Sequence, residues 1–337
     1  MKHSTGTRKN NMGDVTCELC PRYCTIPEGG AGDCRVRVNM DGKLIATTYG
    51  RPSSVHIDPM EKKPLYHFLP GSPVFSIATA GCNLHCRNCQ NWQLSQRGGE
   101  EMEHIYHAPP RSVVDMAREE GCQSIAYTYS DPIIFYEYVR DTAALAHERG
   151  MKNIFVTAGY INRKPLRELC KVLDASNTDL KAFDDGFYRR NCSGSLKPVL
   201  DALVTFREEG VWLEVTNLVI PTLNDDMAII RKMSHWIRDN LGAGTPLHFS
   251  QFHPQYQMRN LPPTPMQSLE RAWAEARDAG LEHVYVDNIY GHKSQSTYCP
   301  NDGTRLIHRI GYRIEEYNLT QDGRCPLCRQ SVYGVWS

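Results

Sequence analysis

Ala80-Gly-Cys-Asn-Leu-His-Cys-Arg-Asn-Cys-Gln-Asn-Trp92 contains three closely spaced cysteines, Cys82, Cys86 and Cys89. This C-x3-C-x2-C spacing on a short loop lets three thiolates converge on a cuboidal iron–sulfur cluster, which normally takes four protein ligands. With three cysteines, one iron remains free to chelate a small molecule through an amine and a carboxylate. A zinc knuckle is the alternative, and three close cysteines at this position favour the cluster.

Composition excludes several classes of partner. The 337 residues include 38 basic and 38 acidic side chains, so the charge balance favours neither nucleic acid nor a membrane surface. The N-terminus lacks the apolar stretch of a secretory signal, and no apolar run is long enough to span a bilayer. Thirteen cysteines in such a chain indicate metal binding under reducing conditions. We therefore expect a cytoplasmic protein.

The chain divides into four predicted parts. These are a disordered N-terminus (1–14), an N-terminal four-cysteine metal-binding segment (15–60), a barrel (61–290) and a C-terminal zinc-ribbon-like segment (291–337). From Val74 onward, short apolar runs alternate with helical patterns, as βα units do. Strands are predicted at 74–79, 124–129, 153–158, 177–182, 211–219, 247–251 and 283–287, and helices at 112–120, 133–149, 195–209, 225–240 and 266–279.

Glycines after four of these helices provide C-terminal stops: Gly121, Gly150, Gly210 and Gly280. Alternation of this kind implies parallel strands wrapped by helices. The predicted fold class is α/β, a partial (β/α) TIM-like barrel, with an open doubly wound sheet as the alternative. Chemistry in such barrels collects where the strands end, and the polar candidates lie there: Cys82, Ser130-Asp131-Pro132, Gly159-Tyr160, Asp179, Lys181, Thr216-Asn217 and His253.

The cysteine triplet on a loop after the first barrel strand resembles the radical S-adenosylmethionine (SAM) superfamily. Asp58-Pro-Met-Glu-Lys-Lys-Pro-Leu-Tyr-His-Phe-Leu-Pro-Gly-Ser72 and Cys89-Gln-Asn-Trp92 resemble the AmmeMemoRadiSam-system radical enzymes, relatives of the pyruvate formate-lyase (glycyl-radical enzyme) activating enzymes. The similarity runs from about Cys17 to Trp336. It implies a radical SAM barrel, a [4Fe–4S] cluster at Cys82, Cys86 and Cys89, and SAM as cofactor.

The resemblance also implies SAM contacts. An Asp-Leu-Lys on the fourth strand and a Phe-His after the sixth contact SAM in activating enzymes, and they look like Asp179-Leu-Lys181 and Phe252-His253 here. The residues predicted to bind SAM are Asn91, Tyr129, Asp131, Asp179, Lys181, Asn217 and His253. Structural alternatives are a helix N-cap for Asp131, an ion pair for Asp179 and Lys181, and a core position for His253.

The chain departs from the pattern of the activating enzymes at several positions. Asn88 replaces an aromatic residue before the third cluster cysteine, and Thr216 replaces an arginine on the fifth strand. Their amine-binding Gly-Gly-Glu corresponds to Tyr127-Thr-Tyr-Ser-Asp-Pro132, where Asp131 is one methylene shorter than the usual Glu. Gly98-Gly-Glu100 matches that motif but precedes the second strand, so we do not expect it at the cofactor.

The resemblance implies an oxygen-sensitive oxidoreductase. One electron cleaves SAM to methionine and a 5′-deoxyadenosyl radical, which abstracts hydrogen from a protein, as glycyl-radical activases do, or from a small molecule. An electron donor such as flavodoxin or ferredoxin is implied, and AMMECR-type or Memo-like proteins are possible partners. The rival hypotheses are a non-catalytic metal-binding interaction protein on a barrel scaffold, and an enzyme that transfers another part of SAM.

Two further cysteine groups predict metal sites. Cys17, Cys20, Cys24 and Cys34 form C-x2-C-x3-C-x9-C, which suits zinc or an auxiliary iron–sulfur cluster, with free buried thiols as the alternative. Cys299, Asp302, Cys325 and Cys328 resemble a zinc ribbon with one carboxylate ligand, for which His292 or His308 could substitute. Cys122, Cys170 and Cys192 are predicted to be buried apolar thiols.

Overall fold

A computed structural model describes residues 2–4, 7–9 and 13–337. Its centre is an eight-stranded sheet with the order β14-β13-β12-β11-β10-β9-β8-β7. Seven strands are parallel: β8 (Pro73–Ala78), β9 (Ser124–Tyr127), β10 (Lys152–Thr157), β11 (Ala175–Asp179), β12 (Trp212–Val219), β13 (Leu247–Gln251) and β14 (Val284–Asp287). The eighth, β7 (Ser54–Pro59), pairs antiparallel with β8 at one edge.

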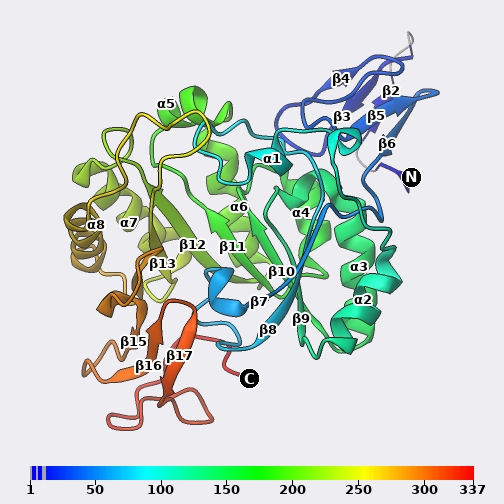
Figure 1. Ribbon diagram of the computed structural model, residues 1–337. Coiled ribbons are helices and arrows are strands. Elements are labelled where there is room, and N and C mark those ends of the chain that lie inside the picture. The colour runs from blue at the N-terminus through cyan, green and yellow to red at the C-terminus, as the bar shows by residue number, and fades with distance from the viewer. Residues whose placement is uncertain (1, 5–6, 10–12) are drawn as a thin grey trace.

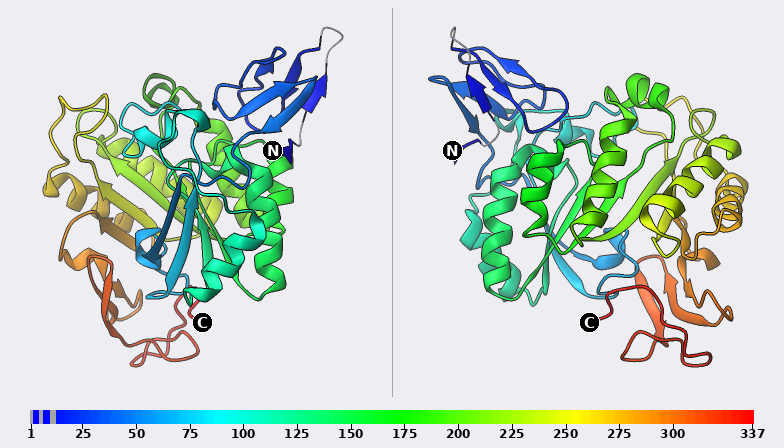
Figure 2. Two further views of the ribbon diagram at one scale, coloured as in Figure 1. Left: turned by 45° about the vertical axis from the view of Figure 1, so that its right-hand side comes forward. Right: turned by 180° about the vertical axis from the view of Figure 1, so that it is seen from behind.

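The helices connect successive strands. They are α2 (Pro110–Glu119), α3 (Tyr136–Glu148), α4 (Arg163–Cys170), α6 (Leu196–Glu208), α7 (Met227–Leu241) and α8 (Met266–Asp278). Figure 1 shows them around the outside of the curved sheet, and the view from behind in Figure 2 shows them covering that face. A strand order that follows the sequence with helices on one side defines a partial barrel and excludes the doubly wound alternative. The predicted fold class is confirmed.

All seven predicted strands and all five predicted helices are present, with ends shifted by a few residues. The four predicted glycine stops have positive φ, between 69° and 94°. Several elements were missed, among them one strand and three helical segments of the barrel. The edge strand β7 alternates polar residues with apolar ones and is half exposed, and α4 has only eight residues, most of them polar. The segment α5 (Asp185–Phe187) and η4 (Tyr188–Cys192), a π-helical turn, carries no helical periodicity.

The N-terminal part forms two small sheets. One contains β1 (Lys2–His3), β5 (Arg37–Met40) and β6 (Lys43–Ala46), and the other contains β2 (Thr7–Lys9), β3 (Val15–Cys17) and β4 (Thr25–Ile26). Disorder was predicted for residues 1–14. Residues 1, 5–6 and 10–12 lie outside the described residues, and the described part of this segment includes β1 and β2, which pair with β6 and β3.

The C-terminal part is a three-stranded sheet of β15 (Thr297–Tyr298), β16 (Arg305–Ile310) and β17 (Arg313–Tyr317). Figure 1 shows it at the opposite end of the molecule from the N-terminal sheets. The fully buried Arg309 fixes it to the barrel by donating to the Tyr66 carbonyl at 2.7 Å and pairing with Glu61 at 3.3 Å. No helix in the described ranges combines the length and apolar character needed to cross a bilayer.

A buried ionic cluster links three neighbouring strands inside the barrel. His248 on β13 contacts Glu214 of β12 through Nε2 at 2.7 Å and Asp287 of β14 through Nδ1 at 2.8 Å. All three side chains are almost inaccessible to solvent. Burial lowers the pKa of His248, but the two carboxylates outweigh burial and raise it to about 9. The imidazolium therefore stays protonated at neutral pH and balances one of the two carboxylate charges, while the backbone N–H groups of Tyr66 and His67 donate to Glu214 and the Tyr66 hydroxyl donates to Asp287.

This cluster predicts a pH dependence of stability. The folded pKa of His248 lies above its ordinary value, so its contribution is complete below pH 6.5 and is lost as pH rises through about 9. We expect the free energy of unfolding to fall by roughly 3 kcal/mol across that window. Urea unfolding at constant ionic strength measures the slope. His248→Gln cannot titrate and should flatten it, and an unchanged slope in that variant would contradict the assignment.

Candidate functional site

A cavity of about 390 Å³ opens at the C-terminal ends of the parallel strands. Chemistry collects at this end of a (β/α) barrel because the strand ends and the loops that follow them converge there. Eight of the residues singled out from the sequence line the cavity: Cys82, Cys86, Cys89, Asn91, Tyr129, Asp131, Asp179 and Lys181. They come from the loops after β8 and β9 and from the end of β11.

The three loop cysteines are held by short local contacts. The Cys82 sulfur accepts from the Leu84 N–H at 3.4 Å, and the Cys89 sulfur lies 3.1 Å from the Ser95 hydroxyl in the short helix α1 (Trp92–Ser95). The loop is also hydrogen-bonded to η4. The His85 N–H donates to the Cys192 carbonyl at 3.0 Å, and the Arg87 N–H donates to the Asn191 carbonyl at 2.8 Å. The loop thus has a fixed shape before any cofactor binds.

Burial governs the protonation of these thiols. It raises the pKa of Cys82 and of Cys89, while a hydrogen bond with the Cys192 thiol and burial together raise the pKa of Cys86. The metal-free thiols are therefore neutral, and binding iron must displace their protons. Among the described residues that line the cavity, these three are the only cysteines. Three soft donors facing an open polar cavity fit a cube with one iron left for another ligand.

Asp131 is buried and fully engaged with protein donors. Its carboxylate accepts from the Ile133 N–H at 3.2 Å, the Thr157 hydroxyl at 2.9 Å and the Ala158 N–H at 3.0 Å. The first contact makes it the N-cap of the turn η3 (Pro132–Phe135) that precedes α3. The other two join the loop after β9 to the end of β10. Asp131 therefore shapes the wall of the cavity from within.

Asp179 and Lys181 form an ion pair of 2.7 Å on the cavity wall. The Asp179 side chain is 39% exposed and that of Lys181 is 18% exposed. Burial lowers the pKa of Lys181, but its ion pair with Asp179 raises it well above its usual range. Lys181 is thus a permanent cation between the cysteine loop and Asp179. Asp179 ends β11 and Lys181 lies just beyond it, although the sequence placed both on the strand.

Sequence reasoning missed the network that supports Tyr129. Asp58 accepts from Lys62 at 2.7 Å, from the buried Lys63 at 2.6 Å and from the Tyr129 hydroxyl. Tyr129 has a left-handed φ of 63°, and Asn91 donates to its carbonyl at 3.1 Å. A non-glycine residue at positive φ is strained, so this network holds the loop after β9 in place. Asp58, Lys62 and Lys63 belong to the stretch whose resemblance was noted in the sequence, but the sequence did not show that they form a network with Tyr129.

Two predicted cofactor residues do not line the cavity. Asn217 donates to the Leu180 carbonyl at 2.7 Å and so braces the turn after β11. His253 is exposed, because the chain leaves β13 two residues earlier and turns outward. Gly98-Gly-Glu100 likewise lies away from the cavity, in and beside the turn η2 (Gly99–Glu101). By contrast Asn88 and Thr216, noted above as departures, are both in the lining.

Four further contributors were not expected from the sequence. Lys62, Asp287 and Tyr312 line the cavity, although Tyr312 belongs to the distant β16–β17 turn. Cys192 is fully buried, as predicted, but lies against Cys86 rather than in an apolar pocket. Of these four residues, only Asp287 could have been expected from its position, because it stands at the end of the last predicted strand. Cys122 and Cys170 are buried, as predicted.

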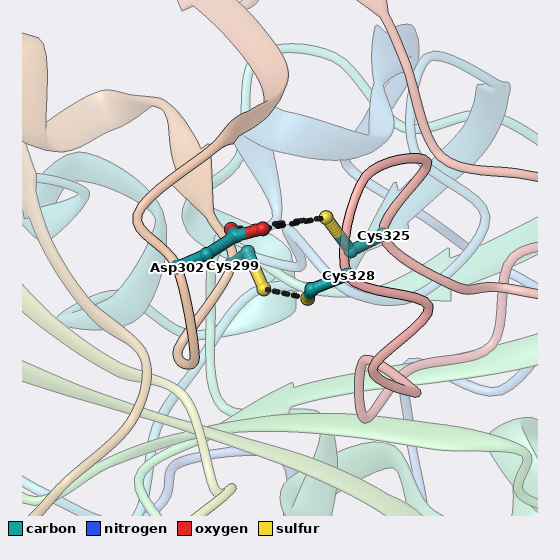
Figure 3. Close-up of side chains that lie close together, drawn as sticks. All are labelled: Cys299, Asp302, Cys325 and Cys328. Carbon is teal, nitrogen blue, oxygen red and sulfur yellow. Dashed lines mark hydrogen bonds between the residues drawn. The ribbon is translucent and has the colours of Figure 1, made fainter.

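The C-terminal residues Cys299, Asp302, Cys325 and Cys328 come together, as Figure 3 shows. Their ligand atoms all lie within 4.8 Å of one another, with 3.5 Å between the sulfurs of Cys299 and Cys328. The Cys325 sulfur lies 3.6 Å from the nearer carboxylate oxygen of Asp302. Neither His292 nor His308 belongs to this group, and the ring of His292 caps the turn η5 (Lys293–Gln295) instead. The arrangement is compatible with an auxiliary metal site.

The N-terminal residues Cys17, Cys20, Cys24 and Cys34 line one small cavity of their own. Arg22, Arg37 and Asn83 complete its polar lining. Asn83 belongs to the cysteine loop of the barrel, so the N-terminal cavity and the main cavity share that loop as a wall.

The fold is a partial barrel with three cysteines on the loop after its first parallel strand. Comparison with known sequences shows which family shares these features. The family model of the radical SAM superfamily matches residues 76–233. Residues 76–233 therefore form a radical SAM superfamily domain. Such a domain implies a [4Fe–4S] cluster and SAM, which the donor set of the main cavity fits.

Three relatives show how far the likeness extends. An uncharacterised protein of Methanocaldococcus jannaschii is 41% identical over 98% of this chain and 99% of its own length. The pyruvate formate-lyase-activating enzyme of Clostridium pasteurianum is 26% identical over 47% of this chain and 67% of its own length. A crystal structure of a radical SAM methyltransferase from Sphaerobacter thermophilus, 15% identical, superposes with a TM-score of 0.50 over 68% of this chain and 70% of that one.

Proposed function

We propose that this chain cleaves SAM reductively at a [4Fe–4S] cluster bound by Cys82, Cys86 and Cys89, and abstracts hydrogen from a second substrate. The observation that carries the proposal is that the buried Cys86 and the partly buried Cys82 and Cys89 open onto the same polar cavity as the Asp179–Lys181 pair. When bound, the reduced cluster supplies the electron that releases methionine and a 5′-deoxyadenosyl radical from SAM. The protein must bind, orient and shield the reactants.

The residues of this chain suit those tasks. Lys181 offers a fixed positive charge for a carboxylate, and Asp179, the more exposed partner, offers acceptor oxygens for ribose hydroxyls. Asp131 and the strained Tyr129 hold the loop that would lie along the cofactor. Trp92 stacks on Tyr256 with ring centroids 5.2 Å apart, which joins the end of the cysteine loop to the segment after β13.

The test is anaerobic reconstitution with iron and sulfide, followed by dithionite and SAM. Formation of 5′-deoxyadenosine and methionine is the expected result. A different SAM-derived product would indicate transfer of another part of SAM. If the reconstituted protein binds a cluster but leaves SAM intact, the non-catalytic interaction protein becomes the better account.

The second substrate is either a protein or a small molecule. Lys62 and Tyr312 add polar groups to the cavity lining apart from the residues assigned to SAM, so they can contact a polar group of the substrate, whereas Asp287 is already paired with His248. Likeness to the pyruvate formate-lyase activating enzyme favours a protein glycine loop. We further propose membership of the AmmeMemoRadiSam-system group, in which AMMECR-type or Memo-like proteins would be partners, a flavodoxin or ferredoxin the donor, and the cytoplasm the location. The Asp58–Ser72 stretch supports this, since its residues Lys62 and Pro64 reach the cavity.

Candidate partners can be separated directly. Each is added anaerobically to the reduced enzyme and SAM, and the mixture is examined by EPR for an organic radical on the partner. A new mass in a metabolite pool without a protein radical would indicate a small-molecule substrate.

We also propose that Cys299, Asp302, Cys325 and Cys328 bind one structural zinc. Sulfurs 3.5 Å apart match two ligands of a single tetrahedral ion, and zinc accepts a carboxylate oxygen as its fourth ligand. Cys325→Ser should remove one zinc per chain, measured by elemental analysis, and lower the melting temperature. Cys170→Ser is the matched control, because this buried thiol belongs to neither cavity. Equal zinc in both variants would contradict the proposal.

A further inference from the structure

The four N-terminal cysteines differ in arrangement from the C-terminal group. Two sulfurs bound to one tetrahedral zinc lie about 3.8 Å apart, given zinc–sulfur bonds of about 2.3 Å. In the described chain, only the C-terminal group brings three or more ligand atoms all within 4.8 Å of one another. Cys17, Cys20, Cys24 and Cys34 line a small void of about 20 Å³, and their sulfurs do not meet that distance criterion. Cys82, Cys86 and Cys89 likewise face a cavity rather than one another.

Sulfurs that bind different irons of a cluster stand further apart than sulfurs that share one ion. The N-terminal cysteines therefore resemble the barrel cysteines in the spacing of their sulfurs, and differ from the C-terminal group. The guanidinium groups of Arg22 and Arg37 also belong to the lining, where Arg22 pairs with Asp33 at 2.7 Å and Arg37 with Glu137 at 2.8 Å. Leu19, Ile26, Ile133 and Ile134 form the apolar remainder, which keeps water away.

The N-terminal site is built directly against the barrel cysteine loop. Arg22 Nε donates to the Asn83 carbonyl at 2.5 Å, and Asp33 pairs with His85 at 2.8 Å. At Gly81, an added Cβ would lie only 2.5 Å from the Cys34 carbonyl oxygen, so only glycine fits there. Asn83 lines the N-terminal cavity, and its neighbour Cys82 lines the main one. One peptide bond thus joins a residue that lines the N-terminal cavity to a residue that lines the main cavity.

We propose that Cys17, Cys20, Cys24 and Cys34 bind an auxiliary iron–sulfur cluster that passes single electrons to the cluster at Cys82, Cys86 and Cys89. A low-potential protein donor of the flavodoxin or ferredoxin class loses one electron, the auxiliary cluster gains it and hands it on, and the barrel cluster is reduced by one electron. No bond or proton changes place in this relay. The relay rests on the proposed function, whereas cluster binding at the N-terminal site does not.

Cluster binding is tested in the full chain with Cys82, Cys86 and Cys89 all replaced by alanine. We expect this variant to retain iron and acid-labile sulfide and to give an EPR signal on reduction. A folded variant that holds zinc without iron, or no metal, overturns the proposal. A second measurement needs no substitution, because the unmodified chain should contain more iron than the about four atoms of one cube. An iron content of one cube with zinc in excess of the C-terminal site would also overturn it.

The relay is tested with Cys20→Ser, using Cys170→Ser as control. The variant should slow formation of 5′-deoxyadenosine at least tenfold more with a flavodoxin or ferredoxin donor than with dithionite, which can reduce an exposed cluster directly. Equal slowing with both reductants would refute the relay. Absence of product from the unmodified chain with either reductant would instead count against the proposed function, so the two failures are distinguishable.

Discussion

Cys86→Ala should reduce formation of 5′-deoxyadenosine to the background of iron-free protein. Cys86 is 8% exposed, contacts Cys192 and lies at the centre of the cysteine loop, so no other cysteine of the cavity lining can replace it. Loss of an outer contact of a metal site already costs about 10–100-fold in affinity or activity, so loss of a ligand should exceed about 100-fold. The rate of 5′-deoxyadenosine formation is measured by mass spectrometry during anaerobic turnover with dithionite.

The control for this result is Cys122→Ala. Cys122 is equally buried but lies at the turn between α2 and β9, outside both cavities, so this variant should retain its cluster and its activity. Product from Cys86→Ala at more than a tenth of the unmodified rate would show that the cluster is held elsewhere.

Glu137→Ala should be the most destabilising single change in the buried ion pairs. Arg37 on β5 donates to both oxygens of Glu137 on α3, at 2.8 and 2.9 Å, and both side chains are almost fully buried. Removing the carboxylate leaves a guanidinium without its counter-ion in the interior, which costs about 3–5 kcal/mol. Urea unfolding under anaerobic conditions measures the loss.

The double variant Arg37→Met, Glu137→Leu separates the ion pair from simple loss of packing. Replacing both charges by apolar groups of similar size removes the uncompensated charge, so most of the stability should return. A double variant as unstable as Glu137→Ala would show that packing around α3, and not charge, dominates.

The partial barrel and its cysteine loop could be predicted from the sequence because both depend on local signals. Apolar runs such as Lys152–Thr157 and the C-x3-C-x2-C spacing carry their own information. The edge strand β7 alternates polar and apolar residues over only six positions, and the π-turn η4 has no periodic pattern, so both depend on the segments that pack against them.

The candidate site could be predicted only in part for the same reason. Position along the chain brought Asp131, Asp179 and Lys181 to the cavity, but could not show that His253 faces outward or that Asn217 braces a turn. Tyr312 reaches the cavity from a hairpin more than 200 residues beyond the cysteine loop. Contacts between segments so distant in sequence follow from tertiary packing, which no local pattern encodes.

The close approach of Cys34 to Gly81 has a consequence for how the molecule matures. The cysteine loop of the barrel uses the N-terminal segment as its backing, so neither part can reach its final shape alone. A shortened chain that starts at the barrel would leave this loop without support, and iron delivery would then compete with misfolding. We therefore expect loading of the barrel centre to follow docking of the N-terminal segment during biogenesis.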